Sequence, residues 1–143
     1  MKLRLHGNSL RLRLSQADVA QFSKTGYVEE AIEFGAGANL CYILESSSKI
    51  VSPRALYQNG ELRVQISCAA SKEWVTTDRV GISGEQALAN GKPLSILIEK
   101  DFKCMHGDDL DADAYPNPMG LGARVRDQRP VTNLQPPPPT VKI

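Results

Sequence analysis

The sequence contains few cysteines, and they do not have the spacing of a disulfide-rich protein. Cys41, Cys68 and Cys104 lie far apart among the 143 residues, and no C-x-x-C pair occurs. This spacing excludes a disulfide framework and is typical of a protein in a reducing cytosol. The sequence also lacks the G-x-S-x-G and H-E-x-x-H motifs and a phosphate-binding loop. We therefore expect a protein that is not an enzyme and has no cofactor.

Long apolar runs are missing as well. No stretch approaches the ~18–20 apolar residues that a membrane helix requires. Lys2 and Arg4 stand near the N-terminus, but no apolar run follows them, so the segment does not have the form of a signal peptide. We expect a cytoplasmic protein without a membrane span.

A large excess of one charge is absent, since 17 Lys and Arg residues face 16 Asp and Glu residues. A net charge of +1 therefore gives no global argument for nucleic-acid binding. The distribution is nevertheless uneven, because the first fourteen residues carry four cations and no acid. Any argument for an anionic partner thus rests on this short segment.

The cationic segment has the pattern of a β-hairpin. Between Lys2 and Leu14 leucines alternate with basic residues on both sides of Gly7-Asn8, which is typical of two strands joined by a type II′ turn. The turn places Leu5 opposite Leu10 and Leu3 opposite Leu12. Arg4 then lies across from Arg11. Like charges in this arrangement repel each other, so an anionic group is expected over them.

A short helix and two more strands are expected after the hairpin. Ser15-Gln16-Ala17-Asp18 has the form of a capping box. The helix should run to about Phe22, with Val19 and Phe22 buried, and stop near Gly26. Strands are predicted over 27–34 and 40–44, which gives the order β-β-α-β-β.

The same order recurs after 52 residues. Asn59-Gly60, a strong hairpin-turn signal, is the counterpart of Gly7-Asn8. On this shift six of the nineteen pairs between 10–28 and 62–80 are identical, and two inserted residues near Gly91 align the remaining strand. We interpret this as a tandem duplication, with repeat 1 over 1–46 and repeat 2 over 53–100.

Each repeat is too small to bury a core alone. We therefore predict one α+β, mostly β domain over 1–103, in which the repeats form a pseudo-twofold barrel. Leu10 and Leu62, and likewise Phe22 and Trp74, should occupy equivalent buried positions. Seven of the nine prolines follow residue 103, so 104–143 is predicted to be an extended or disordered tail.

The run from Leu3 to Ser15, with its G-N-S followed by arginines, resembles the opening of AbrB/MazE-type swapped-hairpin domains. That resemblance implies interleaved β-β-α-β-β units and DNA binding by basic residues of the first strands. It makes the following residues candidates for contacts with duplex DNA: Lys2, Arg4, Asn8, Arg11 and Arg13. The second repeat has Arg54, Leu56, Arg63 and Gln65 at the cationic positions, so only one repeat keeps the basic face.

The chain also resembles a bacterial family of unknown function that carries four short motifs. They are G-N-S-x-R-L-R-L, G-Y-V-E-E, E-K-D-F-x-C and Y-P-N-P, found here at 7–14, 26–30, 99–104 and 115–118. This second resemblance implies no activity.

Several alternatives stay open at this point. The basic face could be an ordinary solvated sheet face, with Glu29 and Glu33 beside Arg11 and Arg13. The acidic, proline-rich tail could instead bind a basic protein partner, as antitoxin tails bind toxins. Metal ligands are the weakest alternative, with the candidates Cys104, His106, Asp109, Asp111 and Asp113. The protein is expected to be a monomeric pseudo-dimer or a homodimer.

Overall fold

The computed structural model describes residues 1–102, 115, 116 and 118, and these contain the predicted element order twice. The first half comprises β1 (Lys2–His6), β2 (Ser9–Leu14), α1 (Gln16–Thr25), β3 (Tyr27–Glu33) and β4 (Asn39–Ser47). The second half comprises β5 (Arg54–Gln58), β6 (Glu61–Ser67), α2 (Cys68–Thr76), β7 (Gly81–Gln86) and β8 (Leu94–Lys100). The prediction of a mostly β chain with two helices is confirmed.

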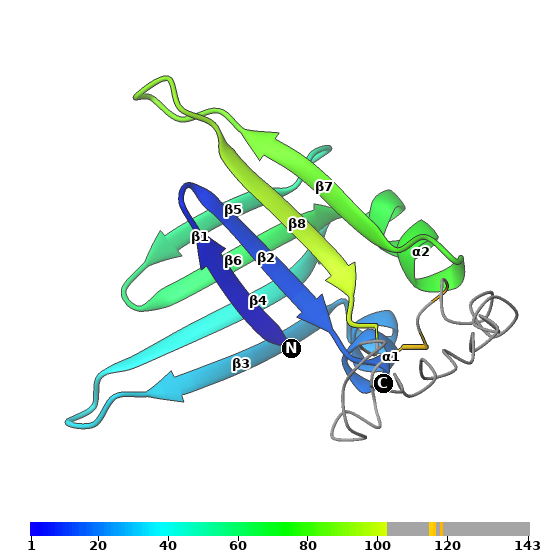
Figure 1. Cartoon of the computed structure of the whole chain (residues 1–143), viewed down its shortest axis with the longest axis horizontal. Helices are drawn as coiled ribbons and strands as arrows, with labels where there is room; N and C mark the ends of the chain where they lie inside the picture. Colours follow the sequence, from blue (N-terminus) through cyan, green and yellow to red (C-terminus); the bar gives the residue numbers. More distant parts are fainter. Residues whose placement is uncertain (103–114, 117, 119–143) are drawn as a thin grey trace, which may run out of the picture.

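The strands form two four-stranded sheets, and each sheet takes one hairpin from each half of the chain (Figure 1). Sheet A has the order β1-β2-β8-β7, and sheet B has the order β3-β4-β6-β5. The central pairs, β2 with β8 and β4 with β6, are parallel, whereas the outer pairs are antiparallel. Backbone pairing among the described strands stops at the edges of each sheet and does not make one closed ring.

The predicted register of the first hairpin is confirmed. Leu3 pairs with Leu12, Arg4 with Arg11, and Leu5 with Leu10. Gly7 has a φ of 53°, the left-handed value that the first central residue of a type II′ turn requires. The turn therefore places all four cations on one face and all the leucines on the other.

The two halves share their strand registers. The pair Lys2–Arg13 of β1 and β2 becomes Arg54–Gln65 of β5 and β6 on a shift of 52 residues. The pair Tyr27–Glu45 of β3 and β4 becomes Gly81–Glu99 of β7 and β8 on a shift of 54. Both halves therefore pair their strands in the same way.

The change of shift corrects the predicted place of the two-residue insertion. It lies in the connection from α2 to β7, over residues 77–80, and not near Gly91. Val28 consequently corresponds to Ile82, which is buried like Val28, whereas the identical residue Val80 is exposed. The identity of Val28 and Val80 in the simple alignment is thus not a structural equivalence.

The core lies between the sheets and is closed at one end by the two helices (Figure 1). Phe22 of α1 and Trp74 of α2 are buried and meet edge to face, with ring centroids 6.1 Å apart. Leu10 is buried, and its counterpart Leu62 is partly buried against the same cluster. The aromatic pair therefore joins the two halves at the helical end.

The two helices differ in their ends. Ser15 and Asp18 form the predicted capping box of α1, and the helix ends at the predicted stop, the left-handed Gly26 (φ 66°). Its last residue, Thr25, lies three residues beyond the expected Phe22. In α2 the Ser67 hydroxyl caps the start, but no acid completes a box. Neither helix is long and apolar enough to span a membrane, among the residues described.

Candidate functional site

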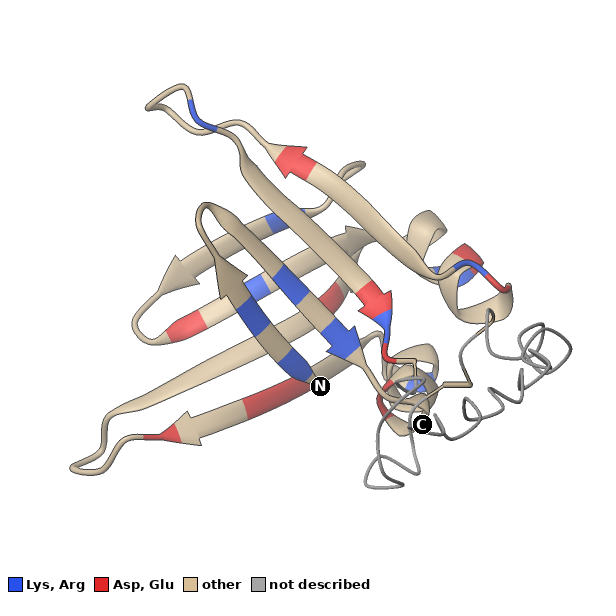
Figure 2. Cartoon of the chain, in the orientation of Figure 1, with Lys and Arg blue, Asp and Glu red and all other residues tan. Residues whose placement is uncertain are grey.

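The cationic residues of the first hairpin lie on the outward face of sheet A. Leu10, Leu12 and Leu14 point into the core, so Arg11 and Arg13 between them point away from it. Figure 2 shows Lys and Arg along β1 and β2, whereas β3 carries Asp and Glu. We call the four cations Lys2, Arg4, Arg11 and Arg13 the basic face.

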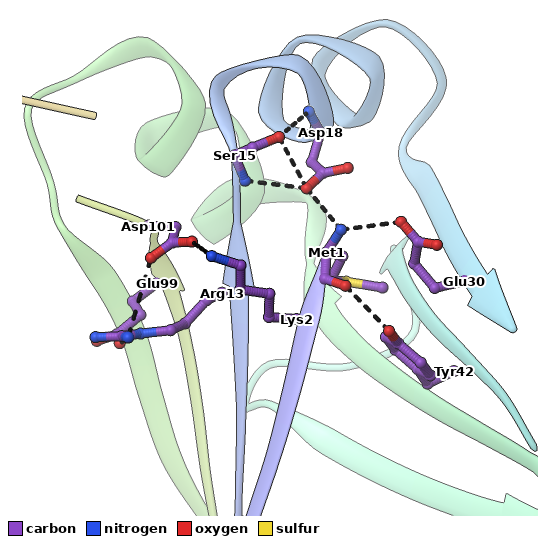
Figure 3. Close-up of polar contacts among 9 residues, drawn as sticks. All are labelled: Met1, Lys2, Arg13, Ser15, Asp18, Glu30, Tyr42, Glu99 and Asp101. Carbon is purple, nitrogen blue, oxygen red and sulfur yellow. Dashed lines mark hydrogen bonds and ion pairs between the residues drawn. The ribbon is translucent and has the colours of Figure 1, made fainter. Parts of the chain in front are cut away.

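Acids of the same chain neutralise one end of the basic face. The Lys2 ammonium lies 2.7 Å from Asp101, and the Arg13 guanidinium lies 2.7 Å from Glu99 and 4.0 Å from Asp101 (Figure 3). Asp101 is buried, and the Glu99 side chain is only 16 % exposed, so solvent screens these pairs less than a surface pair.

The expectation that Glu29 and Glu33 lie beside Arg11 and Arg13 is wrong. Both glutamates belong to β3, which is an edge strand of sheet B. The neighbour of β2 is β8, which comes from the other half of the chain. The acids beside the arginines are therefore Glu99 and Asp101.

Arg4 and Arg11, at the turn end of the basic face, have fewer acidic neighbours than Lys2 and Arg13 among the described residues. They are register partners on β1 and β2. Arg4 is exposed and makes no ion pair with any described residue, and Arg11 has one acid at 3.7 Å, which is Glu99. A cavity of about 170 Å³ lies here, lined by Arg4, His6, Ser9 and Arg11.

Sheet B provides an internal comparison for this pair. The counterpart of Arg11 is Arg63, whose guanidinium reaches Glu45 at 2.6 Å and Glu61 at 2.7 Å. The counterpart of Arg4 is Leu56. The equivalent site on sheet B therefore has one arginine, and two carboxylates already occupy it.

A larger hollow of about 410 Å³ continues from the small cavity across sheet A. It shares Ser9 and Arg11 with the small cavity, and Ser83 and Ser95 extend its polar lining. Its one acid is Glu85. The hollow thus presents hydroxyl groups beside the guanidinium of Arg11.

Asn8, the remaining nucleic-acid-binding candidate, makes contacts of a structural kind. Its side-chain amide donates to the Pro93 carbonyl at 2.8 Å, and its own carbonyl accepts from the Ser95 amide at 3.1 Å. Asn8 therefore ties the first hairpin to β8, and the sequence pattern did not indicate this.

The N-terminal residue anchors the start of β1. The Met1 α-ammonium lies 2.8 Å from Asp18 and 3.0 Å from Glu30, and the Tyr42 hydroxyl donates to the Met1 carbonyl (Figure 3). Burial disfavours the ammonium, but its bonds to Asp18 and Glu30 outweigh burial and raise the pKa of the Met1 amine. Burial likewise disfavours the carboxylate, but the bonds from Met1 and Ser15 lower the pKa of Asp18.

These opposite shifts predict a stability plateau around neutral pH. The contribution of the Asp18 carboxylate is present above its unfolded pKa of about 4 and is lost as pH falls through the lower folded value. The contribution of the Met1 ammonium is present below about pH 8 and is lost as pH rises through its raised folded value.

Denaturant unfolding of the wild type and of Asp18→Asn, measured across pH, tests this prediction. Asp18→Asn should lower stability by about 1–3 kcal/mol near pH 6, since it breaks both the capping box and the pair with Met1. The difference between the two proteins should shrink in acid and again in base. A difference that does not change with pH would contradict the assignment.

Cys41 does not have the environment of a reactive cysteine. Burial and the nearby charges of Glu29 and Glu61 raise the pKa of the Cys41 thiol, which disfavours the reactive thiolate. Cys68 bonds to the Ser46 hydroxyl. No cluster of metal-ligating side chains occurs in the described part of the chain. The metal candidates from Cys104 to Asp113 lie outside that part.

The predicted tail also falls mostly outside the described residues. Tyr115 is described, and it packs on the end of sheet A. Its ring lies 5.6 Å from that of Phe102, and its amide donates to the Asp101 carbonyl. The buried Lys100 ammonium lies 5.6 Å from the same ring and donates to the Thr77 carbonyl.

Sequence reasoning therefore missed Glu99, Lys100 and Asp101 as partners of the first hairpin. The available signal was the E-K-D-F motif, which places two acids and a lysine at the end of the last strand. The parallel pairing of β2 with β8 brings the two acids of this motif beside Lys2 and Arg13, and the sequence did not predict that pairing.

The sequence profile of DUF7009, described as a family of unknown function, matches residues 1–119. No curated protein and no solved structure matches the chain.

Proposed function

The chain belongs to the DUF7009 family of unknown function, and we propose that it is a non-enzymatic interaction protein that contacts duplex DNA through Arg4 and Arg11. One observation carries this proposal. Two adjacent arginines line one cavity, and the one ion pair that they make with described residues joins Arg11 to Glu99 at 3.7 Å. The equivalent Arg63 is held by two acids, at 2.6 and 2.7 Å. Like charges across a strand pair destabilise it unless an anion lies between them.

Phosphate has the chemistry that this cavity requires. A guanidinium binds phosphate oxygens through paired, charge-assisted hydrogen bonds, and two guanidinium groups here border the same space. The Ser9 hydroxyl in the lining already donates to the His6 carbonyl, so the two guanidinium groups are the donors that a phosphate would meet. These contacts would hold a DNA backbone without reading its sequence.

The way in which the two halves exchange hairpins between the sheets supports the resemblance to swapped-hairpin DNA-binding domains. Each sheet joins hairpins of both halves, as interleaved swapped-hairpin units would. The Gln86 amide, in addition, bonds to both the N–H and the C=O of Ala55, which bridges β7 to β5 between the sheets. On this basis we propose an AbrB/MazE-like, pseudo-twofold barrel that arose by duplication.

Neutralising both arginines tests the function. Arg4→Gln/Arg11→Gln should weaken binding of a short duplex DNA by about tenfold or more at ~50 mM salt, because two charged hydrogen bonds are lost. Fluorescence anisotropy measures this. The matched control, Lys49→Gln/Arg54→Gln, removes the same charge elsewhere and should change the affinity by less than about twofold.

Two results would contradict the proposal. The folded wild type could fail to bind DNA at low salt, or both double variants could weaken binding equally. The second result would mean that net charge alone attracts the DNA.

A further inference from the structure

The outer edge of β1 has backbone groups that pair with no strand in the described part of the chain. In an antiparallel hairpin the paired residues alternate between hydrogen-bonded and non-hydrogen-bonded positions. The two-residue turn closes on the His6–Ser9 pair, so Leu3 and Leu5 occupy the non-hydrogen-bonded positions. Their N–H and C=O groups therefore point away from β2, along the free edge of sheet A.

The equivalent edge on β5 confirms this direction. Ala55 corresponds to Leu3, and its N–H and C=O both reach outward to the Gln86 side chain, at 2.7 and 3.2 Å. On the first half the counterpart of Gln86 is Ile32, whose side chain forms no hydrogen bonds. The clamp that occupies the edge of β5 therefore has no equivalent at β1.

An apolar side chain is exposed on this open edge. Leu5 is 65 % exposed. It lies on the inward face of sheet A, opposite the buried Leu10. The open edge therefore combines free backbone groups with uncovered apolar surface on its inward side.

We propose that β1 accepts a strand from a partner protein, and that this strand alternates acidic with apolar side chains. Its backbone would bond to Leu3 and Leu5, its apolar side chains would cover Leu5, and an acid would lie beside Arg4 on the outward side. Antiparallel pairing of β1 with β1 of a second copy is disfavoured, because it would bring the Lys2 and Arg4 side chains of the two copies together. This inference does not depend on DNA binding.

A synthetic peptide tests the inference on the full chain. The probe is a ten-residue peptide that alternates Val with Glu, and its control alternates Val with Lys. Isothermal titration should show the Glu peptide binding at least tenfold more tightly. Amide hydrogen exchange at Leu3 and Leu5 should slow when the Glu peptide binds.

Proline substitutions distinguish the edge of β1 from the equivalent edge of β5. Leu5→Pro removes an outward N–H and no bond to β2, which an edge strand tolerates. It should weaken peptide binding at least tenfold and leave DNA binding within about twofold. Tyr57→Pro, at the equivalent position on β5 and 69 % exposed in the wild type, should change neither. Circular dichroism checks that both variants fold.

The following outcomes would overturn the inference. The wild type could fail to bind the Glu peptide or could bind both peptides equally. Tyr57→Pro could weaken binding as much as Leu5→Pro. Self-association that the Glu peptide disrupts would instead assign the edge to a second copy, whose β3 carries the acids Glu29 and Glu33.

Discussion

Replacing Trp74 by alanine should lower the free energy of unfolding by about 3–5 kcal/mol. The indole is fully buried, meets the Phe22 ring edge to face, and donates its N–H to the Val80 carbonyl at 3.1 Å. Its removal would leave a cavity at the helical end, where the two halves of the chain meet. Since a domain of this kind is stable by only about 5–15 kcal/mol, much of the total would be lost.

The Trp74→Phe variant separates packing from hydrogen bonding. It keeps a ring against Phe22 and should lose about 1–3 kcal/mol, because one hydrogen bond and part of the indole volume are removed. The Val80 carbonyl still accepts from the Lys100 N–H at 3.0 Å. Denaturant unfolding monitored by far-UV circular dichroism measures both variants. If Trp74→Ala unfolded at the wild-type midpoint, the two halves would not depend on this contact.

Replacing Glu99 by glutamine should strengthen DNA binding severalfold at ~50 mM salt. Glu99 lies 2.7 Å from Arg13 and 3.7 Å from Arg11, so its carboxylate charge competes with phosphate for both. Without that charge Arg11 loses the one ion pair that it makes with a described residue, and Arg13 loses its 2.7 Å pair but keeps Asp101 at 4.0 Å. The variant should therefore gain about one phosphate contact.

Glu45→Gln is the matched control for this gain. Glu45 occupies the equivalent position on sheet B and holds Arg63, but Glu61 holds the same arginine at 2.7 Å. Arg63 would therefore stay neutralised, and DNA affinity should change by less than about twofold. Unchanged or weaker binding by folded Glu99→Gln protein would contradict the competition between carboxylate and phosphate.

The sequence predicted the local parts of the fold well, because neighbouring residues determine them. The turn at Gly7-Asn8 sets the register of the first hairpin, and Ser15 with Asp18 forms the helix cap. The pairing of Arg13 with Glu99 could not be predicted in this way. These residues are 86 positions apart and meet only because β2 pairs with β8 across the two halves.

The candidate site was predicted in part for the same reason. Alternation alone gathered Lys2, Arg4, Arg11 and Arg13 on one face, and the structure places them there. Which of them are neutralised depends on β8, so the sequence could not separate Arg4 and Arg11 from the other two. The open edge of β1 depends on Ile32 standing where the other half has Gln86, and a simple 52-residue alignment does not pair them.

The salt dependence of DNA binding tests the central claim most directly. Each phosphate contact contributes a slope of about −0.9 to log K against log[salt]. Two free arginines predict a slope of about −2, an affinity loss of roughly tenfold between 50 and 200 mM salt, whereas four free cations would give about −3 to −4. Arg4→Gln/Arg11→Gln should bring the slope close to zero. A slope that this double variant leaves unchanged would contradict the assignment of DNA binding to Arg4 and Arg11.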